Sequence, residues 1–472
     1  MRILVLGGGP GGQAAAFEAA RLGAEVTLVE KENLGGTCLN WGCIPTKTIL
    51  RSARIAHDAR NAAEFGLRLE PASVDIERLM ERKEGVVTEL RSQIEATARR
   101  LEVEVVYGEG HMTGPRTVRV TTGGEHVDHE PDAVILATGS TVFKLPGIDH
   151  ALERVWTSDE AVSLVDIPNR ILIIGGGVIG LEFACAYASF GSEVHVVELT
   201  PTVLPGNDKR VQKSAQAALE ALGVTFYLGT KADVVAQYGD TMVTTLEDGE
   251  MIETDIVLSA VGRVPNSADL GLDLAGVAMD RAAVKVDSYF RTSVSGVYAI
   301  GDLIGGMMLA HVADEEGIVV ARNAIREYAY GKTEGLLAKL TAEPFLESVD
   351  YDCIPACVYT FPEIGVVGRT RDGAKAAGLD AVQAVAKYTA NGKALGEGEH
   401  DGFVQLIAEN GTGRILGAQI VGPHAVETIH EIALAMRHGL TVTDVAETVH
   451  AHPTVSEVIK LAAQDAEAKC GG

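Results

Sequence analysis

The sequence lacks a long apolar run, a cationic leader and a cysteine framework. No stretch approaches the roughly 20 consecutive apolar residues that span a bilayer, and residues 2–6 open directly on an apolar strand. Six cysteines in 472 residues do not make a secreted disulfide scaffold. We therefore expect a cytoplasmic protein, and in a reducing compartment a persistent disulfide is more often catalytic than structural.

Positive charge is scarce as well. The 40 Lys and Arg residues are outnumbered by 65 Asp and Glu, which gives a formal net charge of −25. Such a surface repels phosphate backbones and anionic lipid, so nucleic acid and membranes are poor partners. With 46% apolar and 22% charged residues, the composition is typical of a compact chain. Its length allows about two or three domains.

Two cysteines lie five positions apart in a glycine-rich segment, residues 35–47 (GGTCLNWGCIPTK). On a continuous helix Cys38 and Cys43 would be separated by about 7.5 Å along the axis. A disulfide needs α-carbons roughly 4.4 to 6.8 Å apart, so a bridge requires a local break, which Gly42 can supply. Because so short a loop adds little stability, the spacing favours redox chemistry, with an inert pair as the alternative.

A dinucleotide-binding fingerprint opens the chain. An apolar strand leads into GGGPGG at residues 7–12, then an alanine-rich helix and a second strand that ends in Glu30. Gly7 would make the tight turn, Gly9 would let the backbone approach a pyrophosphate, and Gly12 would allow close helix packing. Glu30 is placed to bind ribose hydroxyls. A tight strand-to-helix turn without a nucleotide is the alternative.

The same pattern recurs with a constant shift of 168 positions and no gap. The repeated residues are Gly175, Gly177, Gly180 and Glu198. Two such units predict two nucleotide cofactors, and two adenine dinucleotides are the natural pair.

Glu198 also bears on the choice of nicotinamide cofactor. Its carboxylate would accept hydrogen bonds from a ribose diol but would repel a 2′-phosphate, and residues 199–201 bring no cation. NAD is therefore favoured over NADP, with a solvated acid at a strand end as the alternative.

The rest of the chain alternates between strands and helices. Helices are expected at 74–100, 307–326 and 425–438, and strands at 104–120, 132–137, 255–261, 296–302, 354–359, 403–408 and 415–421. We expect the strands at 104–120 and 132–137 to share one sheet. The pattern predicts an α/β protein with two doubly wound, Rossmann-like domains and a C-terminal α+β domain. The expected boundaries are 1–148 and 276–343 for the first domain, 149–275 for the second and 344–472 for the third.

Two further residues lie where a cofactor could reach them. Asp302, at a strand tip, could meet a phosphate or ribityl group. His311 falls in the first turn of a helix whose start could present backbone donors to an electron-rich ring. Taken alone, His311 would be a packing residue.

The remaining cysteines carry no predicted chemistry. Cys353 and Cys357 would share one face of a strand about 13 Å apart, too far for a disulfide or a shared metal ion. We expect Cys353, Cys357 and also Cys185 to lie in the core, and we expect Cys470 to lie in a disordered tail. No metal site is predicted.

The segment 450–457 (HAHPTVSE) places a histidine five residues before a carboxylate. With Pro453 forcing the turn between them, Glu457 could hold one ring nitrogen of His452 and leave the other as a base. A cis His452–Pro453 peptide bond is expected. A structural histidine is the alternative.

Together, the segments 35–47, 308–311 (MLAH) and 450–457 resemble those of the flavin-dependent pyridine nucleotide-disulfide oxidoreductases, most closely the dihydrolipoamide dehydrogenases. The resemblance covers nearly the whole chain. It implies FAD in the first nucleotide-binding domain, NAD in the second, a homodimer formed through the C-terminal domain, and a dihydrolipoyl-bearing carrier protein or free dihydrolipoamide as substrate.

The resemblance also implies catalytic roles. Cys38 is similar to the thiol that exchanges with substrate, and Cys43 to the thiol that faces the flavin. His452 resembles the base, serving the other subunit, and Glu457 its orienting acid. The remaining matches are a pair beside the flavin's reactive nitrogen, Lys47 and Glu182.

Cofactor-binding residues follow from the fingerprints and the resemblance. For FAD these are Gly7, Gly9, Gly12, Glu30, Lys31, Gly36, Thr37, Thr138, Gly139, Asp302, Met308, Leu309, Ala310 and His311; for NAD they are Gly175, Gly177, Gly180, Glu198 and Gly262. The alternatives are a glutathione- or mycothiol-type disulfide reductase and a structural flavoprotein subunit of a multienzyme complex.

Overall fold

The structure is a computed structural model that describes residues 1–69, 73–332 and 345–471. The chain divides into two compact units, each assembled from three segments. Unit 1 comprises Met1–Pro45, Met80–Phe143 and Gly262–Val349, and unit 2 comprises Thr46–Leu79, Lys144–Val261 and Asp350–Gly472. In the part of the chain that is described, no helix is long and apolar enough to cross a membrane.

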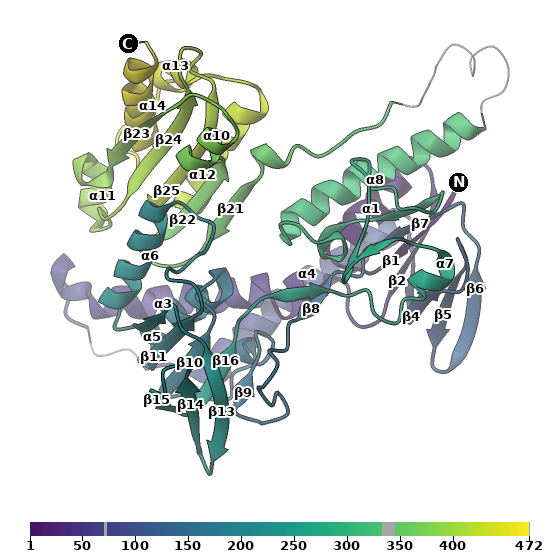
Figure 1. Ribbon diagram of the computed structural model, residues 1–472, viewed down its shortest axis with the longest axis horizontal. Coiled ribbons are helices and arrows are strands. Elements are labelled where there is room, and N and C mark those ends of the chain that lie inside the picture. Colours follow the sequence, from purple (N-terminus) through teal and green to yellow (C-terminus); the bar gives the residue numbers. More distant parts are fainter. Residues whose placement is uncertain (70–72, 333–344, 472) are drawn as a thin grey trace. The chain divides into compact units, whose positions relative to one another are not determined.

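Unit 1 is built on a five-stranded parallel sheet in the order β20-β7-β1-β2-β3. Figure 1 labels its strands β1, β2 and β7. The strands are β1 (Arg2–Leu6), β2 (Glu25–Glu30), β3 (Glu104–Tyr107), β7 (Ala133–Leu136) and β20 (Val297–Ala299). Helix α1 (Pro10–Arg21) joins β1 to β2 and packs along α8 (Ala310–Gly331). Every residue of β7 is buried, as expected for a parallel strand in the interior of a sheet.

A second, antiparallel sheet in unit 1 corrects the expectation for residues 104–137. β3 and β7 belong to the parallel sheet, whereas β4 (Glu109–Met112) and β5 (Val118–Thr122) pair with β6 (Glu125–His129). The β5–β6 hairpin turns through Gly123 and Gly124, whose φ angles of 58° and 90° suit the tight turns of twisted hairpins. Residues 104–137 thus contribute strands to two different sheets.

The other elements of unit 1 are short, apart from one long helix. They are α2 (Gly36–Asn40), α4 (Ile76–Arg100), α7 (Leu272–Ala275), β8 (Ser140–Val142), β17 (Arg263–Pro265), β18 (Met279–Asp280), β19 (Ala283–Val284) and the 3₁₀ helix η3 (Gly301–Ile304). The first residues of α4, 76–79, belong to unit 2. The predicted helix at 74–100 is confirmed as α4. The helix predicted from residue 307 begins only at Ala310, because Met308 takes a left-handed φ of 48°.

Unit 2 contains a second five-stranded parallel sheet, in the order β12-β11-β10-β16-β9. Its strands are β9 (Val155–Trp156), β10 (Arg170–Ile174), β11 (Glu193–Glu198), β12 (Thr225–Leu228) and β16 (Ile256–Ser259). It also contains helices α3 (Cys43–Arg60), α5 (Val178–Phe190) and α6 (Lys209–Ala221), the 3₁₀ helices η1 (Ala62–Phe65) and η2 (Glu160–Val162), and an antiparallel sheet of β13 (Ala232–Tyr238), β14 (Thr241–Leu246) and β15 (Met251–Thr254). The first residues of α3 lie in unit 1.

The two parallel sheets repeat one another in register. β1 pairs with β2 from Arg2↔Glu25 onward, and β10 pairs with β11 from Arg170↔Glu193 onward. Each pair of strands is joined by a helix, α1 or α5, that starts directly after its glycine turn. The 168-residue repeat of the sequence is therefore a repeat of structure.

The C-terminal part of unit 2 is an antiparallel sheet in the order β21-β22-β25-β24-β23. Its strands are β21 (Pro355–Val358), β22 (Glu363–Gly368), β23 (Ala381–Lys387), β24 (Phe403–Glu409) and β25 (Ile415–Gly422). Its helices are α10 (Arg371–Ala376), α11 (Gly392–Glu397), α12 (Ala425–Arg437), α13 (Val442–Glu447) and α14 (Glu457–Cys470), with the 3₁₀ helices η4 (Tyr351–Cys353) and η5 (Tyr388–Ala390).

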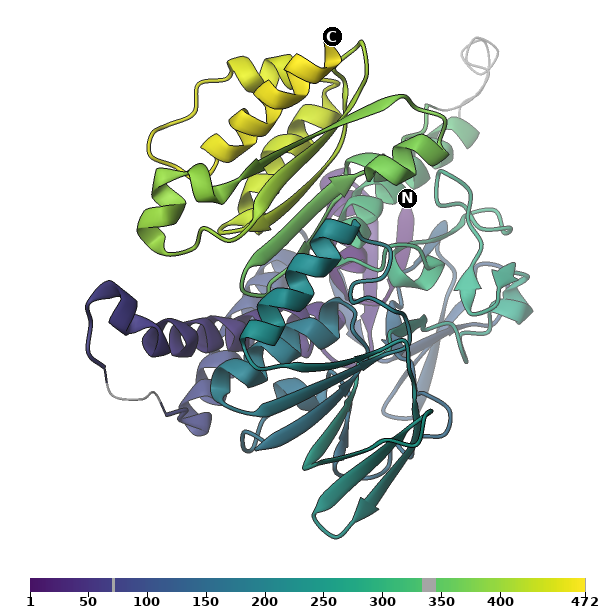
Figure 2. The ribbon, with the colours of Figure 1, turned by 60° about the vertical axis from the view of Figure 1, so that its left-hand side comes forward.

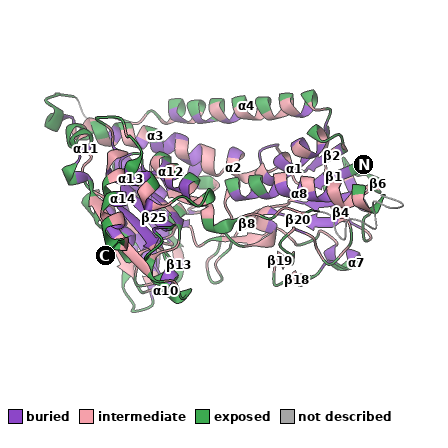
Figure 3. Ribbon diagram, turned by 90° about the horizontal axis from the view of Figure 1, so that it is seen from above, coloured by how far each residue is buried: buried purple, intermediate pink, exposed green. Residues whose placement is uncertain are grey.

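Helices cover this antiparallel sheet and close a core around it. α12 packs on β22 and β25, and α14 packs on β23 and β24 (Figure 2). β25 is buried along its whole length (Figure 3). The predicted strands at 354–359, 403–408 and 415–421 and the helix at 425–438 are confirmed, whereas β22 and β23 were not predicted.

Three cysteines differ from expectation. Cys353 is not on a strand: it ends a 3₁₀ turn that the side chain of Asp350 caps, and its side chain is only partly buried. Cys357 lies on β21 and is also only partly buried, but it packs against the buried cluster of that domain and so borders the core. Cys470 is the last residue of α14 and packs against the buried cluster of that domain, because good helix formers carry α14 to the end.

Candidate active site

The segment with the two cysteines has the helix break that the sequence predicts. Cys38 lies in α2, which ends at Asn40, and Cys43 is the first residue of α3. Gly42 sits in the break, where a Cβ would lie 2.8 Å from the Thr37 carbonyl oxygen and 3.3 Å from Cys38 Cα. The chain thus folds back on itself between the cysteines. A thiolate at the start of α3 would be favoured by the partial positive charge of a helix N-terminus.

Hydrogen bonds of Asn40 within the segment, and of Arg91 from a distant helix, hold α2 in place. Asn40 donates hydrogen bonds to the carbonyl oxygens of Leu34 and Gly36, at 3.1 and 2.9 Å. Arg91, on α4, donates to Asn40 Oδ1 through Nε at 3.1 Å and through a terminal nitrogen at 2.5 Å. Sequence reasoning missed Asn40 and Arg91, because their pairing across 51 positions leaves no local pattern.

The first glycine loop has the shape of a phosphate cradle. Gly7 has a φ of 108°, and a Cβ there would lie 2.3 Å from the Ala137 carbonyl oxygen. A Cβ on Gly12 would lie 1.9 Å from the Gly7 carbonyl oxygen, so only glycine allows α1 this close to β1. A Cβ on Gly9 would meet only Gly36 Cα, at 3.9 Å, which leaves the backbone there open to a ligand.

The acid that ends β2 is buried and held by backbone donors. Gly8 N–H donates to Glu30 Oε2 at 2.7 Å, and Glu32 N–H donates to Oε1 at 2.8 Å. Each carboxylate oxygen keeps a lone pair for a ribose hydroxyl. A dinucleotide with its pyrophosphate at the start of α1 fits these residues. Lys31 is exposed and pairs with Glu32.

The second glycine loop reproduces this arrangement in unit 2. A Cβ on Gly180 would lie 1.9 Å from the Gly175 carbonyl oxygen, and a Cβ on Gly177 would meet nothing within 4 Å. Gly176 N–H donates to Glu198 Oε2 at 2.6 Å. A dinucleotide fits here as well, by the same tests of close approach and open backbone.

Thr200 gives the second acid a further partner that the sequence did not indicate. Its backbone N–H and its hydroxyl both donate to Glu198 Oε1 at 2.8 Å. In unit 1 the corresponding position is Glu32, which offers only its amide. Glu198 is therefore fixed as a hydrogen-bond acceptor at the end of β11.

The acid predicted to contact the first cofactor lies in a network within unit 1. Ser140 Oγ donates to Asp302 Oδ2 at 2.5 Å, and Arg263 Nε donates to Ser140 Oγ at 2.7 Å. The terminal nitrogen of Arg263 also lies 3.4 Å from Thr37 Oγ1, beside Cys38. The network brings together residues 37, 140, 263 and 302 and adds Ser140 and Arg263 to the predicted set.

The start of α8 and the turn at 138–139 complete the predicted residues of unit 1. Leu309 is the residue before Ala310, the first residue of α8, and His311 is exposed, so it is not a core packing residue. Thr138 Oγ1 donates to the Asn266 carbonyl oxygen at 2.8 Å. A buried acid further along α8, Glu316, accepts a hydrogen bond from Gly301 N–H at 2.6 Å and thereby fixes the turn before Asp302.

An ion pair between a half-buried lysine and a buried acid joins two helices of unit 2. Lys47 Nζ, on α3, lies 3.1 and 2.8 Å from the two carboxylate oxygens of Glu182, on α5. Glu182 is only 2% exposed. The backbone N–H of Tyr359 donates to Glu182 Oε1 at 3.1 Å, and Lys47 Nζ lies 4.5 Å from the centroid of the Tyr359 ring. The pairing of Lys47 with Glu182 agrees with the sequence, whereas Tyr359 was not predicted.

The histidine and the acid of the C-terminal segment meet in unit 2. Glu457 Oε1 lies 3.0 Å from His452 Nδ1, and Thr454 N–H donates to Glu457 Oε2 at 2.9 Å. The Thr454 amide, followed by the His452 ring, holds the pKa of Glu457 below its usual range. The His452 side chain is 79% exposed. The predicted cis His452–Pro453 peptide bond is confirmed.

Three of the other cysteines have the character of inert thiols. Burial raises the pKa of Cys185 to about 12 and that of Cys357 to about 11. Burial, together with a hydrogen bond to Asp350, raises the pKa of Cys353 to about 11. These thiols keep their protons at neutral pH, so they are poor nucleophiles. Among the described residues, no cluster of three or more His, Cys, Asp or Glu is arranged to hold a metal ion.

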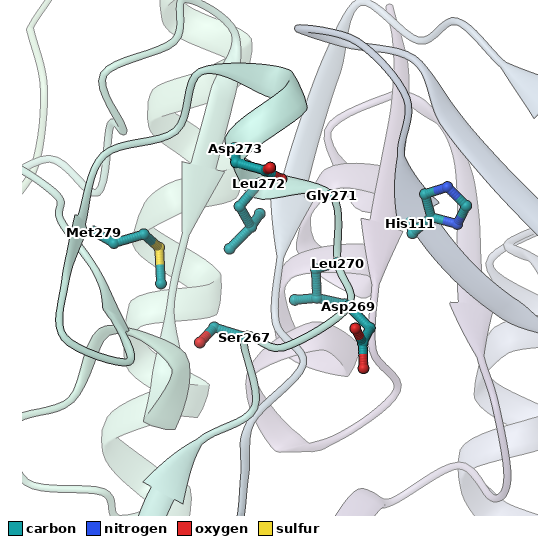
Figure 4. Close-up of a pocket in the computed structure, with 8 residues that line it drawn as sticks. All are labelled: His111, Ser267, Asp269, Leu270, Gly271, Leu272, Asp273 and Met279. Carbon is teal, nitrogen blue, oxygen red and sulfur yellow. The ribbon is translucent and has the colours of Figure 1, made fainter.

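A pocket of about 450 Å³ lies elsewhere in unit 1 (Figure 4). His111, Ser267, Asp269 and Met279 are among the residues that line it, and their side chains do not converge on a common point. None of the predicted site residues lines this pocket.

Comparisons with known proteins decide the family. The family described as pyridine nucleotide-disulphide oxidoreductase matches residues 1–317, and its dimerisation domain matches residues 354–463. The chain belongs to the pyridine nucleotide-disulphide oxidoreductases. The resemblance and the α/β fold class inferred from the sequence are thus confirmed.

Relatives match along nearly the whole chain. The chain is 41% identical to a dihydrolipoyl dehydrogenase of Haloferax volcanii, over 98% of this chain and 96% of that protein. It is 40% identical to a leghemoglobin reductase of Vigna unguiculata, over 98% of this chain and 86% of that protein. The solved structure of LpdA from Mycobacterium tuberculosis superimposes with a TM-score of 0.90 at 28% identity, over 98% of this chain and 99% of that one.

Proposed function

We propose that this chain is a dihydrolipoyl dehydrogenase, which oxidises dihydrolipoyl groups to the disulfide and reduces NAD by way of FAD. The 41% identity to a dihydrolipoyl dehydrogenase over 98% of the chain carries the proposal. The two cysteines, the His452–Glu457 pair and the two glycine cradles supply the parts that the chemistry needs. The scarcity of cysteine supports a cytoplasmic location.

FAD is assigned to the first nucleotide-binding domain (residues 1–148 and 276–343) and NAD to the second (149–275). The cradle at Gly9, with Glu30 at the end of β2, supports the first assignment. The fixed carboxylate of Glu198 supports the second, because it accepts hydrogen bonds from a ribose diol and repels a 2′-phosphate. Residues 344–472 would pair two subunits, in agreement with the dimerisation domain matched there.

The proposed chemistry begins with proton transfer. His452 Nε2 takes the proton of a dihydrolipoyl thiol, while Glu457 holds Nδ1 and stabilises the imidazolium that forms. The resulting thiolate attacks Cys38 Sγ and breaks a Cys38–Cys43 disulfide, so that Cys43 leaves as a thiolate. The second substrate thiol then attacks the substrate sulfur of the mixed disulfide, its proton passes to the departing Cys38 thiolate, and the lipoyl disulfide is released. FAD, when bound, supplies the transfer of the electron pair as hydride to NAD.

We assign His452 to the active site of the partner subunit in a homodimer. Its ring is 79% exposed, which leaves the Nε2 side accessible to another chain. Lys47 and Glu182 are assigned to the reactive edge of the flavin, where a lysine ammonium would stabilise the charge of the reduced ring.

One assay separates this proposal from its rivals. Purified protein would be offered dihydrolipoamide with NAD or NADP, and glutathione disulfide with NADH or NADPH. Reduction of NAD by dihydrolipoamide at the highest rate supports the proposal. Faster oxidation of NADPH by glutathione disulfide would favour a disulfide reductase, and flavin-containing protein without turnover in any pair would favour a structural subunit.

A further inference from the structure

The Lys47–Glu182 pair of unit 2 has a third member. Lys47 belongs to α3 and Glu182 to α5, whereas Tyr359 directly follows β21 of the antiparallel sheet. Three separate elements thus meet at one ion pair. The last residue of β21, Val358, is paired with Ile364 of β22, so a sheet fixes the backbone position of Tyr359.

Tyr359 contacts both charges of the pair. Its ring lies under the ammonium, with Lys47 Nζ 4.5 Å from the ring centroid. Its backbone N–H donates to Glu182 Oε1 at 3.1 Å, the oxygen that also receives a hydrogen bond from Lys47 at 3.1 Å. One residue therefore stabilises the cation through its side chain and the anion through its main chain.

We propose that Tyr359 is a positioning residue that fixes the ammonium of Lys47 through its aromatic face and the carboxylate of Glu182 through its amide. This inference rests on the proposed function for its catalytic meaning, since that function assigns the pair to the flavin. The contact itself is independent of the assignment.

The chemistry of the ring suits this role. Burial, followed by the nearby Cys357 and Glu182, raises the pKa of the Tyr359 hydroxyl to about 12, so the ring is a neutral phenol in the neutral pH range. A neutral aromatic face attracts a cation that lies within about 6 Å of its centroid. Phenylalanine would keep that face and lose only the hydroxyl, whereas leucine would remove the face and keep the backbone amide.

The first test uses the apoprotein. Unaltered protein, Tyr359→Phe and Tyr359→Leu would be treated with acetic anhydride at one pH, and acetylation of Lys47 would be quantified by mass spectrometry. The exposed Lys213 on α6 serves as the internal reference. We expect Lys47 to react about 2- to 30-fold faster in Tyr359→Leu, the range of a lost cation–π contact, and unchanged in Tyr359→Phe. Equal reactivity in all three proteins would overturn the contact.

The second test uses the FAD-loaded protein and a double-mutant cycle with Lys47→Met. If Tyr359 acts through Lys47, Tyr359→Leu lowers the reduction equilibrium of the flavin about 2- to 30-fold, which is roughly 10 to 45 mV, and has no further effect in the Lys47→Met background. A shift of the same size in both backgrounds would overturn the positioning role, because it would reflect a general change in packing.

The two tests distinguish a failure of the role proposed for Tyr359 from a failure of the proposed function. If unaltered protein binds flavin and oxidises dihydrolipoamide but the cycle is additive, only the role of Tyr359 is refuted. If unaltered protein has no flavin or no dihydrolipoamide activity, the proposed function fails, and the acetylation of Lys47 still decides whether Tyr359 holds it. Thermal unfolding of each variant measures any loss of fold separately.

Discussion

Glu457 Oε1 lies 3.0 Å from His452 Nδ1, and the carboxylate begins α14. A carboxylate at a helix N-terminus is stabilised as an anion, and the Thr454 amide adds a hydrogen bond. The acid is thus kept ionised while it orients the ring. This arrangement leaves Nε2 as the nitrogen available for proton transfer.

Replacement of His452 by glutamine should slow the reduction of enzyme by dihydrolipoamide about 10²- to 10⁴-fold, the usual contribution of a general base. Reduction of the flavin by NADH should change little, because that step takes no proton from a thiol. Stopped-flow measurement of the two half-reactions checks both. Equal slowing of the two would remove His452 from the role of base.

The pH dependence of Glu457 has a definite sign. The pKa of Glu457 is lowered in the fold, so its ionised form stabilises the fold. This contribution is fully present above the usual glutamate pKa and is lost as the pH falls through the lowered value. We expect Glu457→Gln to oxidise dihydrolipoamide more slowly than the unaltered protein at neutral pH. The unaltered protein should also slow at acidic pH as Glu457 is protonated, and the variant should lack that decrease. An unchanged profile of rate against pH contradicts the orienting role.

Replacement of Cys38 by serine should abolish turnover with dihydrolipoamide while leaving the flavin bound, since serine forms no mixed disulfide. The visible spectrum of the purified variant reports the flavin, and NADH formation reports turnover. Cys185→Ser is the matched control, because that thiol is buried and keeps its proton. Full activity of Cys38→Ser would refute the exchange role.

The repeated glycines offer a matched pair of variants. Gly12→Ala and Gly180→Ala each place a Cβ 1.9 Å from a glycine carbonyl oxygen, one in each cradle. We expect Gly12→Ala to lose FAD, and Gly180→Ala to keep FAD and raise the KM for NAD at least about tenfold, the effect of some 1.4 kcal/mol of lost binding. Flavin content and steady-state kinetics check the pair. Loss of flavin from both variants would contradict the assignment of FAD to the first cradle alone.

A homodimer with shared sites predicts complementation. Cys38→Ser and His452→Gln homodimers should both be inactive, but subunits exchanged between them would form one intact site in each mixed dimer. Random mixing makes half of the dimers mixed, so we expect recovery of about a quarter of the unaltered activity. No recovery after verified subunit exchange would place both residues in a site within one chain.

The local parts of the site could be predicted from the sequence. Glycine turns, the helix break at Gly42 and the pairing of His452 with Glu457 each depend on residues a few positions apart, so the spacing specifies the geometry. A single glycine turn is common, but the internal repeat made the prediction of nucleotide binding specific. Two copies in the same register do not arise from turn chemistry alone.

The parts that escaped prediction depend on long-range contacts. Arg91 holds Asn40 from another helix, and Ser140 links Arg263 to Asp302. Tyr359 contacts the Lys47–Glu182 pair from the end of strand β21. No periodicity in the sequence indicates which of these distant residues will contact one another. Cys353 was missed for a different, local reason: the Asp350 side chain caps a 3₁₀ turn over residues 351–353, so the strand starts only at Pro355.

The two glycine cradles share one backbone arrangement but differ in what lies beside them. Gly8 and Gly176 each donate a backbone N–H to the acid at the end of the second strand, Glu30 or Glu198, so this contact does not distinguish the two cradles. The difference begins after the second strand. In unit 1 the chain continues into α2, where a Cβ on Gly36 would lie 2.7 Å from Gly9 Cα, so the helix that carries Cys38 packs closely against the cradle. The glycine fingerprint is thus common to both units, whereas the segment that follows the second strand brings the cysteine-bearing helix α2 against the first cradle.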